Sequence, residues 1–308
     1  MAQELSSVDD SHASRAQNTR AARQMVRARV VARREVAPRY VALTLWCPFV
    51  AQGARPGQFV HVLPQPDDSE ETTSWSYDPL LRRAFSVMDV RGDEFELLFR
   101  VEGRGTQRLA SARPEQWLDL LGPLGNGFSL QVPDGASALL VGGGVGVPPL
   151  VLTARALREA GVRTEAFIGA RSASDVLCVE RFRALGTPSR IATDDGSRGL
   201  HGRVDALLAQ SLHANPAVVV FACGPYPMLR AVAHLCQEHG VACQVSLEEN
   251  MPCGIGVCNG CVVPIQSAST EATGNEGLGK ELVGDDYGRY RRICVHGPAC
   301  DAKEIAWS

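Results

Sequence analysis

Short apolar runs separated by turn residues fill the chain from residue 25 to about 133. They include YVALTLW, GQFVHVLP, RAFSVMDV and EFELLFRV, and Gly, Pro and Asp lie between them with little helical periodicity. Such short runs are typical of strands in an antiparallel barrel. We therefore predict an antiparallel β-barrel domain over residues 25–134.

The pattern changes to strands alternating with helices from residue 136 to about 245. The strand-like SALLVGGG leads into the helical PPLVLTARALREAG, and AVVVFACGP leads into PMLRAVAHLCQEHG. This alternation predicts parallel βαβ units in a doubly wound sheet. We place this α/β domain at residues 135–246 and a small C-terminal domain at 247–308, so the predicted fold is multidomain.

The first 24 residues carry no periodic apolar positions and are predicted to be a disordered tail. Seven arginines between residues 15 and 34 allow a second interpretation, a nucleic-acid arm or a targeting peptide, although the run merges into a strand pattern. The net charge of −3 provides no overall basic field. We therefore expect neither nucleic acid nor an anionic membrane as a partner.

Two features favour a cytoplasmic protein. The most apolar run, residues 138–152, is shorter than the roughly 20 residues of a membrane span and is interrupted by glycine and proline. The polar N-terminus lacks the apolar segment of a secretory signal. We therefore expect a cytoplasmic protein without a membrane span.

Glycines mark the first strand-to-helix junction of the α/β part, in VGGGVGVPPL. Without side chains they let the backbone approach a pyrophosphate, and the following helix start offers free N–H groups. Pro149 stands where the standard dinucleotide fingerprint has its third glycine, so a simple tight turn remains the alternative. The second signal for a dinucleotide site is FACGPYPML, which places Cys223 at the carboxyl end of a predicted buried strand. Ligands bind at this end of the strands in such sheets, so Cys223 is expected beside a nicotinamide. The alternative is a cysteine that is only packed in the core.

The barrel part contributes two further motifs. LRRAFSV places Arg83 and Ser86 on one strand, and a planar guanidinium suits a diphosphate, although a strand arginine is often only solvated. FRVEGRGTQRLA sets two glycines around Arg104, ahead of Thr106 and a helix start, as a second phosphate cradle. GPLGNGF follows at the predicted exit of the barrel.

In this order and spacing, the motifs of residues 25–250 resemble the ferredoxin-reductase-like flavoprotein family. The resemblance implies FAD in the barrel, with Arg83 on the pyrophosphate and Ser86 near the isoalloxazine, and a nicotinamide dinucleotide in the α/β domain. The implied FAD residues are Arg83, Ala84, Phe85, Ser86, Leu98, Phe99, Arg100, Gly105 and Thr106. The implied dinucleotide residues are Gly142, Gly143, Gly144, Gly146, Cys223, Gly224 and Pro225.

The sequence leaves the choice of dinucleotide open. An acid after the second α/β strand favours NAD and an arginine suits the 2′-phosphate of NADP; here Arg171 and Ser172 come first and Asp175 is the nearest acid. The family resemblance favours NAD, with NADP not excluded. Glu248 or Glu249, just before the cysteine-rich segment, would lie near a flavin, or at the surface.

Four of the ten cysteines form one pattern. Cys253, Cys258 and Cys261 have the spacing of a plant-type [2Fe–2S] site, and Cys294 supplies a fourth thiolate. Structural zinc, which also takes four thiolates, remains an alternative, and disulfides are disfavoured in a reducing compartment. The other cysteines are predicted mostly to be buried apolar residues: Cys47, Cys178, Cys223, Cys236, Cys243 and Cys300.

The cysteine segment narrows the resemblance. EENMPCGIGVCNGCVV followed by RRICVHGPAC resembles the electron-transfer subunits of B-type, NAD-linked dihydroorotate dehydrogenase. That resemblance implies a relay through [2Fe–2S] and FAD between NAD and an FMN-containing dihydroorotate dehydrogenase subunit, two copies of each, in pyrimidine biosynthesis. Two features depart from that subfamily. The segment between Cys261 and Cys294 is longer than expected, and His296 stands where an acidic residue is common. We interpret His296 as an exposed loop side chain.

Two other functions stay open. One is an NAD(P)H oxidoreductase subunit with flavin and iron–sulfur in another complex, resembling that of a hydrogenase or of a ferredoxin–NADP reductase. The other is a zinc-stabilised nucleotide-binding scaffold without catalysis.

Overall fold

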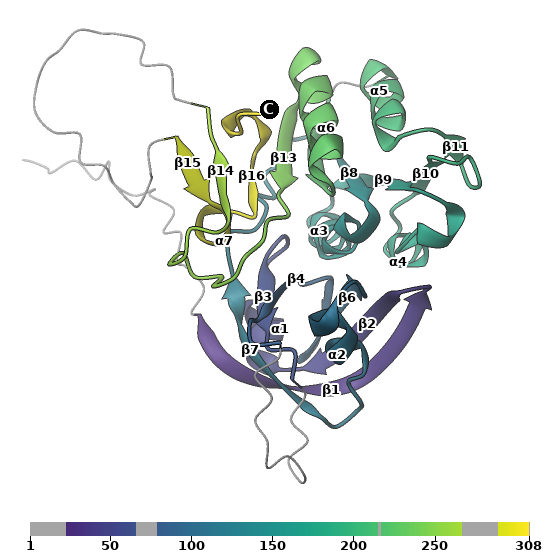
Figure 1. Cartoon of the computed structure of the whole chain (residues 1–308). Coiled ribbons are helices and arrows are strands. Elements are labelled where there is room, and N and C mark those ends of the chain that lie inside the picture. Colours follow the sequence, from purple (N-terminus) through teal and green to yellow (C-terminus); the bar gives the residue numbers. More distant parts are fainter. Residues whose placement is uncertain (1–22, 66–78, 215–216, 267–288, 308) are drawn as a thin grey trace, which may run out of the picture.

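A computed structural model describes residues 23–65, 79–214, 217–266 and 289–307 (Figure 1). Nearly all of the predicted tail, and most of the long segment between Cys261 and Cys294, lie outside these ranges. The described chain forms two seven-stranded sheets and one two-stranded sheet. None of the helices in these ranges combines the length and apolar character that a bilayer crossing requires.

The N-terminal sheet is antiparallel, with the strand order β4-β3-β7-β1-β2-β6-β5. Figure 1 shows it strongly curled, with the long β1 sweeping beneath the other strands. Its outermost strands, β4 and β5, are not paired with each other in the described residues, so hydrogen bonds do not close the predicted barrel. The elements are β1 (Gln24–Ala37), β2 (Tyr40–Trp46), α1 (Pro48–Gly53), β3 (Phe59–Val62), β4 (Arg83–Ser86), β5 (Asp89–Arg91), β6 (Glu94–Arg100), α2 (Arg104–Ala110) and β7 (Trp117–Leu124).

The second sheet confirms the doubly wound prediction. Its order is β11-β10-β9-β8-β12-β13-β16, parallel throughout except for β16. From the central β8 the chain winds outward first through β9 and β10, then through β12 and β13, which creates a crevice between the carboxyl ends of β8 and β12. Its elements are β8 (Ser137–Gly143), η1 (Gly144–Gly146), α3 (Pro149–Glu159), β9 (Arg163–Ala170), η2 (Ala173–Asp175), α4 (Val179–Ala184), β10 (Ser189–Thr193), β11 (Leu200–His201), α5 (Val204–Ala214), β12 (Val218–Cys223), α6 (Tyr226–Glu238) and β13 (Ala242–Ser246).

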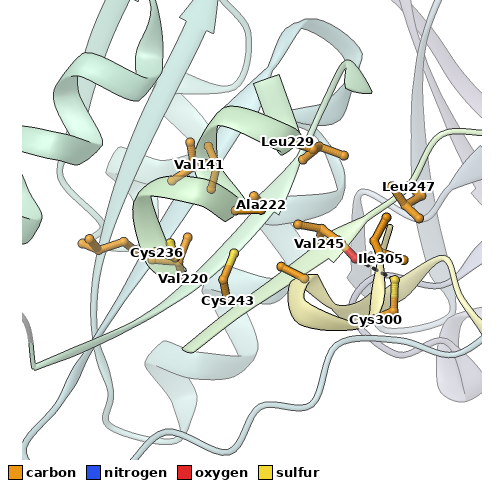
Figure 2. Close-up of a cluster of buried hydrophobic side chains, with 14 of the residues drawn as sticks. Val141, Val220, Ala222, Leu229, Cys236, Cys243, Val245, Leu247, Cys300 and Ile305 are labelled. Carbon is orange, nitrogen blue, oxygen red and sulfur yellow. Dashed lines mark hydrogen bonds between the residues drawn. The ribbon is translucent and has the colours of Figure 1, made fainter. Parts of the chain in front are cut away.

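The C-terminal segment is fastened to the second sheet. Its last strand pairs antiparallel with β13, and Cys300 donates its thiol hydrogen to the carbonyl oxygen of Val245 across that pair (Figure 2). Cys236 of α6 and Cys243 of β13 pack in the same core, as predicted for apolar cysteines (Figure 2). The remaining elements are β14 (Val262–Pro264), β15 (Tyr290–Arg292), α7 (Ile293–His296), β16 (Ala299–Asp301) and η3 (Ala302–Glu304).

One hydrophobic core joins all three parts of the chain. It contains Phe59 and Leu124 of the curled sheet, Val220 and Val245 of the α/β sheet, and Cys261 of the cysteine segment. A separate core fills the inside of the curled sheet. The cysteine segment is therefore packed against both sheets.

A buried ion pair also links the two sheets. The Asp89 carboxylate of β5 is 1% exposed and accepts two hydrogen bonds of 2.8 Å from the Arg155 guanidinium of α3. Arg181 of α4 lies 3.9 Å from the same carboxylate and forms a 2.7 Å ion pair with Glu96 of β6. These contacts hold the helices of one domain against the strands of the other.

Candidate functional site

A cavity of about 700 Å³ lies between the curled sheet and the carboxyl ends of the α/β strands. Its volume is in the range of small-molecule and cofactor sites. Met251 and Pro298 bring the segments around Cys253 and Cys294 to its wall. All three parts of the chain therefore meet at this cavity.

The curled sheet supplies two strands to the wall. The six predicted flavin residues that line the cavity are Ala84, Phe85, Ser86, Leu98, Phe99 and Arg100. Ala84 and Ser86 alternate with the buried Phe85 along β4, whose backbone pairs with β3. Glu102 and Tyr40 also line it, and the sequence offered no signal for either.

The other predicted flavin residues gather at the start of α2, outside the lining of the cavity. The Arg83 guanidinium lies over Gly105, where a Cβ would come within 2.9 Å of Nε. Thr106 Oγ1 accepts hydrogen bonds from the backbone N–H groups of Glu102 and Gly103 and donates to the Gly103 carbonyl. The structure thus brings Arg83, Gly105 and Thr106 together, with the threonine hydroxyl occupied by the helix cap.

The predicted dinucleotide motifs meet at the crevice of the α/β sheet. Gly142 pairs with Cys223 across β8 and β12, and Gly143, Gly144, Cys223 and Pro225 line the cavity. Gly144 has a positive φ of 54°, which opens the turn from β8 into α3. Gly224, between Cys223 and Pro225, does not line the cavity.

Gly146 allows the closest backbone approach at this crevice. A Cβ on this residue would lie 2.3 Å from the Cys223 carbonyl oxygen and 2.5 Å from the Gly224 Cα. Backbone atoms cannot rotate away as a flexible side chain would. The glycine is therefore required by the packing of η1 against the end of β12.

Replacing Gly146 by alanine should separate these two segments and misplace the dinucleotide site. We expect NADH binding to weaken about tenfold, which corresponds to about 1.4 kcal/mol. Equilibrium binding of NADH to the purified variant would measure this. Gly53→Ala, at the end of α1, is the matched control, because neither glycine has a positive φ and the Cβ added at Gly53 would make only an ordinary contact, 3.5 Å from Pro123 Cγ. An unchanged dissociation constant in Gly146→Ala would contradict the assignment.

Two acids and a thiol line the cavity near β12 and β13. Burial and the nearby Glu248 raise the pKa of Cys223 well above its usual value, so the thiol stays protonated. The Glu248 side chain is exposed to the cavity, but protein atoms surround much of its carboxyl group. The partial loss of water around the carboxylate, together with the negative charge of Glu102, raises the pKa of Glu248. Glu249 lines the cavity too, so both predicted acids face it.

Charged residues of both signs that bear on the choice between NAD and NADP line the cavity. Arg171, Asp175 and Asp194 all line it. Asp175 accepts hydrogen bonds from Tyr40, at 3.4 Å, and from Ser172, at 3.2 Å. The sequence pattern indicated Arg171, Ser172 and Asp175 but not Asp194, although Asp194 directly follows strand β10.

The four patterned cysteines lie in two interacting pairs. A hydrogen bond from the Cys294 thiol lowers the pKa of Cys261 to about 6, and the backbone N–H of Cys294 lies 3.4 Å from the Cys261 sulfur. Burial acts to raise the pKa of Cys253, but the N–H groups of Cys258 and its neighbours outweigh it and lower the value to about 7. One thiol in each pair is thus favoured as thiolate, the form that binds metals.

The two pairs do not close around one point. In the parts of the chain that the structure describes, no group of three or more His, Cys, Asp or Glu side chains surrounds a single metal position. The Gly260 N–H lies 3.4 Å from the Cys258 sulfur, and the Arg292 guanidinium donates to the Gly256 carbonyl at 2.6 Å, which holds the loop.

His296 is half-buried at the end of α7, so its interpretation as an exposed loop residue is wrong.

His61 of β3 lies against Gly254 of the cysteine loop, and the sequence patterns did not single it out. It is fully buried, and neither ring nitrogen has a hydrogen-bond partner among the described residues. Burial, together with the charge of Arg82, lowers the pKa of His61 to about 4. The available signal was a polar residue in the otherwise apolar run GQFVHVLP.

Comparisons with known proteins agree with this geometry. Residues 140–234 match the oxidoreductase NAD-binding domain family. The electron transfer subunit of dihydroorotate dehydrogenase B (NAD(+)) from Bacillus caldolyticus is 39% identical over 280 residues, 90% of this chain and 96% of that protein. The subunit of the same name from Enterococcus faecalis is 37% identical over 281 residues, again 90% of this chain and 96% of that protein.

Solved structures share the arrangement of the two sheets. The structure of an NADH-dependent reduced ferredoxin-NADP oxidoreductase, described for flavin-based electron bifurcation, matches with a TM-score of 0.71 and 26% identity over 91% of this chain and 90% of that one. A ferredoxin reductase of carbazole 1,9a-dioxygenase matches with a TM-score of 0.57 and 23% identity over 71% of this chain and 67% of that one. The second likeness shows the fold alone.

Proposed function

The chain belongs to the family of electron transfer subunits of NAD-linked dihydroorotate dehydrogenase B, and on that basis we propose that it carries electrons between a dihydroorotate-oxidising subunit and NAD. The observation that carries the proposal is the cavity where the two sheets and the cysteine segment meet. A relay needs its cofactors close together, and this cavity borders all three predicted cofactor sites. The chain would act as an NAD-linked flavin oxidoreductase subunit.

FAD fits the curled-sheet side of the cavity. Ala84, Ser86 and Leu98 offer backbone and small or apolar surfaces to a flat ring, and Arg83 offers a positive charge to a diphosphate. FAD would supply the exchange between two-electron hydride chemistry and one-electron transfer. The protein's part is to hold the ring between β4 and the ends of the α/β strands, where the three segments of the chain meet.

NAD fits the crevice between β8 and β12. Gly143 and Gly144 leave the backbone open to a pyrophosphate, and Cys223 and Pro225 border the position expected for the nicotinamide. The protonated, uncharged thiol of Cys223 presents a small neutral surface against which a flat ring can lie. The carboxylates of Asp175 and Asp194 would favour a ribose hydroxyl, as in NAD, over the 2′-phosphate of NADP. The guanidinium of Arg171 would favour the phosphate, so the choice is tested by titration with both NADH and NADPH.

The cysteine pairs suit a [2Fe–2S] cluster. Each iron of such a cluster takes two of the four thiolates, which matches one pair from Cys253 and Cys258 and another from Cys261 and Cys294. A zinc ion would instead need all four thiolates around one point. The backbone N–H groups of Gly260 and Cys294, which are directed at the sulfurs of Cys258 and Cys261, would remain there as hydrogen-bond donors around the bound cluster.

The partner is proposed to dock beside the cysteine loop, in an assembly with two copies of each subunit. Ile255 is 43% and Val257 74% exposed, although both are apolar and lie between predicted cluster ligands. Exposed apolar side chains beside a redox centre suit a protein partner. The FMN-containing catalytic subunit would approach here, which leaves only the thickness of the loop between the two proteins' cofactors.

Placing a charge on this loop should weaken the assembly. We expect Val257→Asp to raise the dissociation constant for the catalytic subunit about tenfold, because a carboxylate would have to be desolvated at the contact. Analytical ultracentrifugation or surface binding with the catalytic subunit would measure it. Val36→Asp, at an exposed position near the end of β1, is the control. Equal affinities for both variants would place the contact elsewhere.

An anaerobic titration tests the proposed function. The purified protein is titrated with NADH and then NADPH and followed optically, and then with dihydroorotate in the presence of the catalytic subunit. We expect flavin and iron–sulfur absorption, bleaching by NADH, and bleaching by dihydroorotate only when the partner is present. A protein without these absorption bands would refute the relay.

One alternative function rests on a specific likeness. The similarity to the NADH-dependent reduced ferredoxin-NADP oxidoreductase covers 91% of the chain. In a complex of that kind the chain would pass electrons to another iron–sulfur partner. Reduction by NADH combined with failure of dihydroorotate and its catalytic subunit to reduce the protein would favour this alternative.

A further inference from the structure

His61 is the buried polar group that the proposed function leaves without a role. Its side chain is 0% exposed, and its two ring nitrogens have no hydrogen-bond partner among the residues that the structure describes. Leaving a buried donor or acceptor unpaired destabilises a fold, and buried polar groups in proteins are therefore paired as a rule. A fully buried imidazole thus indicates a partner beyond the residues that the structure describes, and a bound group is one such partner.

The strand geometry shows which way the ring faces. Along β3, Val60 and Val62 belong to the core inside the curled sheet, whereas Phe59 belongs to the core shared with the cysteine segment. Successive side chains of a strand point to opposite faces, so His61 shares the face of Phe59. The two rings are in contact, with centroids 5.7 Å apart. His61 therefore points out of the curled sheet, toward the cysteine segment.

The cysteine loop lies directly on the imidazole. A Cβ on Gly254 would lie 2.6 Å from Cε1, 2.8 Å from Nε2 and 2.9 Å from Nδ1 of His61. Gly254 follows Cys253 in the chain and has a φ of +70°, a conformation that glycine adopts without strain. The missing side chain lets the loop backbone close over the ring beside a predicted cluster ligand.

The opposite neighbour of His61 belongs to the flavin side. In the antiparallel pair of β3 and β4, His61 is directly across from Ala84, which lines the cavity. His61 itself does not line the cavity. The ring therefore lies between the wall of the predicted flavin site and the loop of predicted cluster ligands, covered from both sides.

We propose that His61 donates a ring N–H to the sulfur shell of the [2Fe–2S] cluster, at the Cys253 thiolate or an inorganic sulfide, and raises the cluster's reduction potential. This inference rests on the proposed function, because it needs the cluster. A neutral imidazole has one N–H donor, and hydrogen bonds to the sulfurs help to set the potential of such clusters. Reduction adds negative charge, so a donor favours the reduced state. His61 is thus a positioning and tuning residue rather than a catalytic one.

The first test compares substitutions at His61 in the full, cofactor-loaded protein. His61→Phe removes the donor and keeps a flat ring, His61→Gln keeps N–H donors, and Val62→Ala changes a buried residue on the opposite face of the same strand. Iron content, the EPR spectrum of the reduced protein and potentiometric titration are measured for each.

We expect His61→Phe to retain iron and to lower the equilibrium constant for reduction of the cluster about tenfold. For a one-electron couple this corresponds to a reduction potential that is about 59 mV lower. His61→Gln should show a smaller shift and Val62→Ala none. An unchanged potential in His61→Phe, or a shift confined to the flavin, would overturn the proposal. A purely structural role would lower the melting temperature in Val62→Ala and His61→Phe alike without moving the potential.

A second test does not need His61→Phe, which could lose its iron, and examines the protein that retains His61. Protein labelled with ¹⁵N at histidine is reduced and examined by pulsed EPR, with His61→Gln as the reference. We expect a weak coupling to one histidine nitrogen that disappears in His61→Gln; equal spectra would overturn the proposal. An unsubstituted protein without iron or cluster absorption would instead refute the proposed function itself, which separates the two failures.

Discussion

Replacing Asp89 by asparagine is expected to destabilise the protein by about 3 kcal/mol, the lower end of the range for breaking a buried ion pair. The lower end applies because the Arg155 side chain keeps 24% exposure, while the Asp89 side chain keeps 1%. Asparagine preserves the shape but removes the charge, which leaves the guanidinium of Arg155 without its paired carboxylate. Urea unfolding, followed by tryptophan fluorescence and flavin release, would measure the loss.

The chain provides a matched control for this effect. Glu180 and Arg183 form an ion pair of 3.4 Å with side chains that are 79% and 80% exposed. Exposed pairs of this kind contribute about 0–1 kcal/mol, so Glu180→Gln should change stability little. The double variant Asp89→Leu with Arg155→Met should recover much of the loss, because a buried pair can often be replaced by apolar residues. Equal effects of Asp89→Asn and Glu180→Gln would contradict the buried-pair explanation.

The same pair bears on function, because it joins β5 of the flavin side to α3 of the dinucleotide side. Helix α3 begins directly after the glycine turn that is proposed to hold the pyrophosphate. A weakened contact would let the two sides of the cavity separate, so NADH should reduce the flavin of Asp89→Asn more slowly even where the variant is folded.

Sequence patterns predicted those features that depend on neighbours along the chain. The glycine turn after β8 and the Cys-Gly-Pro after β12 each lie at a strand end, and a strand followed by a helix can be recognised locally. Once both strands are assigned to one parallel sheet, their carboxyl ends must lie at the same edge, which brings both motifs to that edge. That β8 and β12 are neighbours, with Gly142 paired to Cys223, was not predicted and comes from the structure.

Long-range pairing explains what the sequence did not reveal. Tyr40 reaches Asp175 from 135 residues away, and Asp89 reaches Arg155 across the boundary of the two predicted domains. Neither contact leaves a periodic signal in the chain. The C-terminal strand β16 adds to the α/β sheet instead of staying within the predicted cysteine domain, because β13 offers a free edge to it. His61 lies in the run GQFVHVLP, which was predicted only as a strand, and nothing in that pattern predicted the burial of a histidine.

Removing the last predicted cluster ligand should abolish electron transfer to the catalytic subunit. We expect Cys294→Ala to lower NAD-dependent dihydroorotate oxidation by the complex by more than about 100-fold, a larger loss than changes in the outer shell of a metal site produce. Cys294 is 1% exposed and its thiol interacts with that of Cys261, so alanine leaves one iron position with a single thiolate. NADH should still bleach the flavin of the variant, because the cavity residues that border the flavin and dinucleotide positions are unchanged.

Cys300→Ala is the matched control for that loss. Cys300 lies six residues further along, is 7% exposed, and hydrogen-bonds only backbone carbonyls, of Val245 and Pro298, among the contacts described for it. Both substitutions remove a buried thiol and leave a similar small cavity, so they should lower stability by similar amounts. Cluster absorption, iron content and transfer to the partner should be lost in Cys294→Ala alone. If both variants transferred electrons equally well, the cysteine pairs would have no part in the relay and the route would have to run from the flavin directly to the partner.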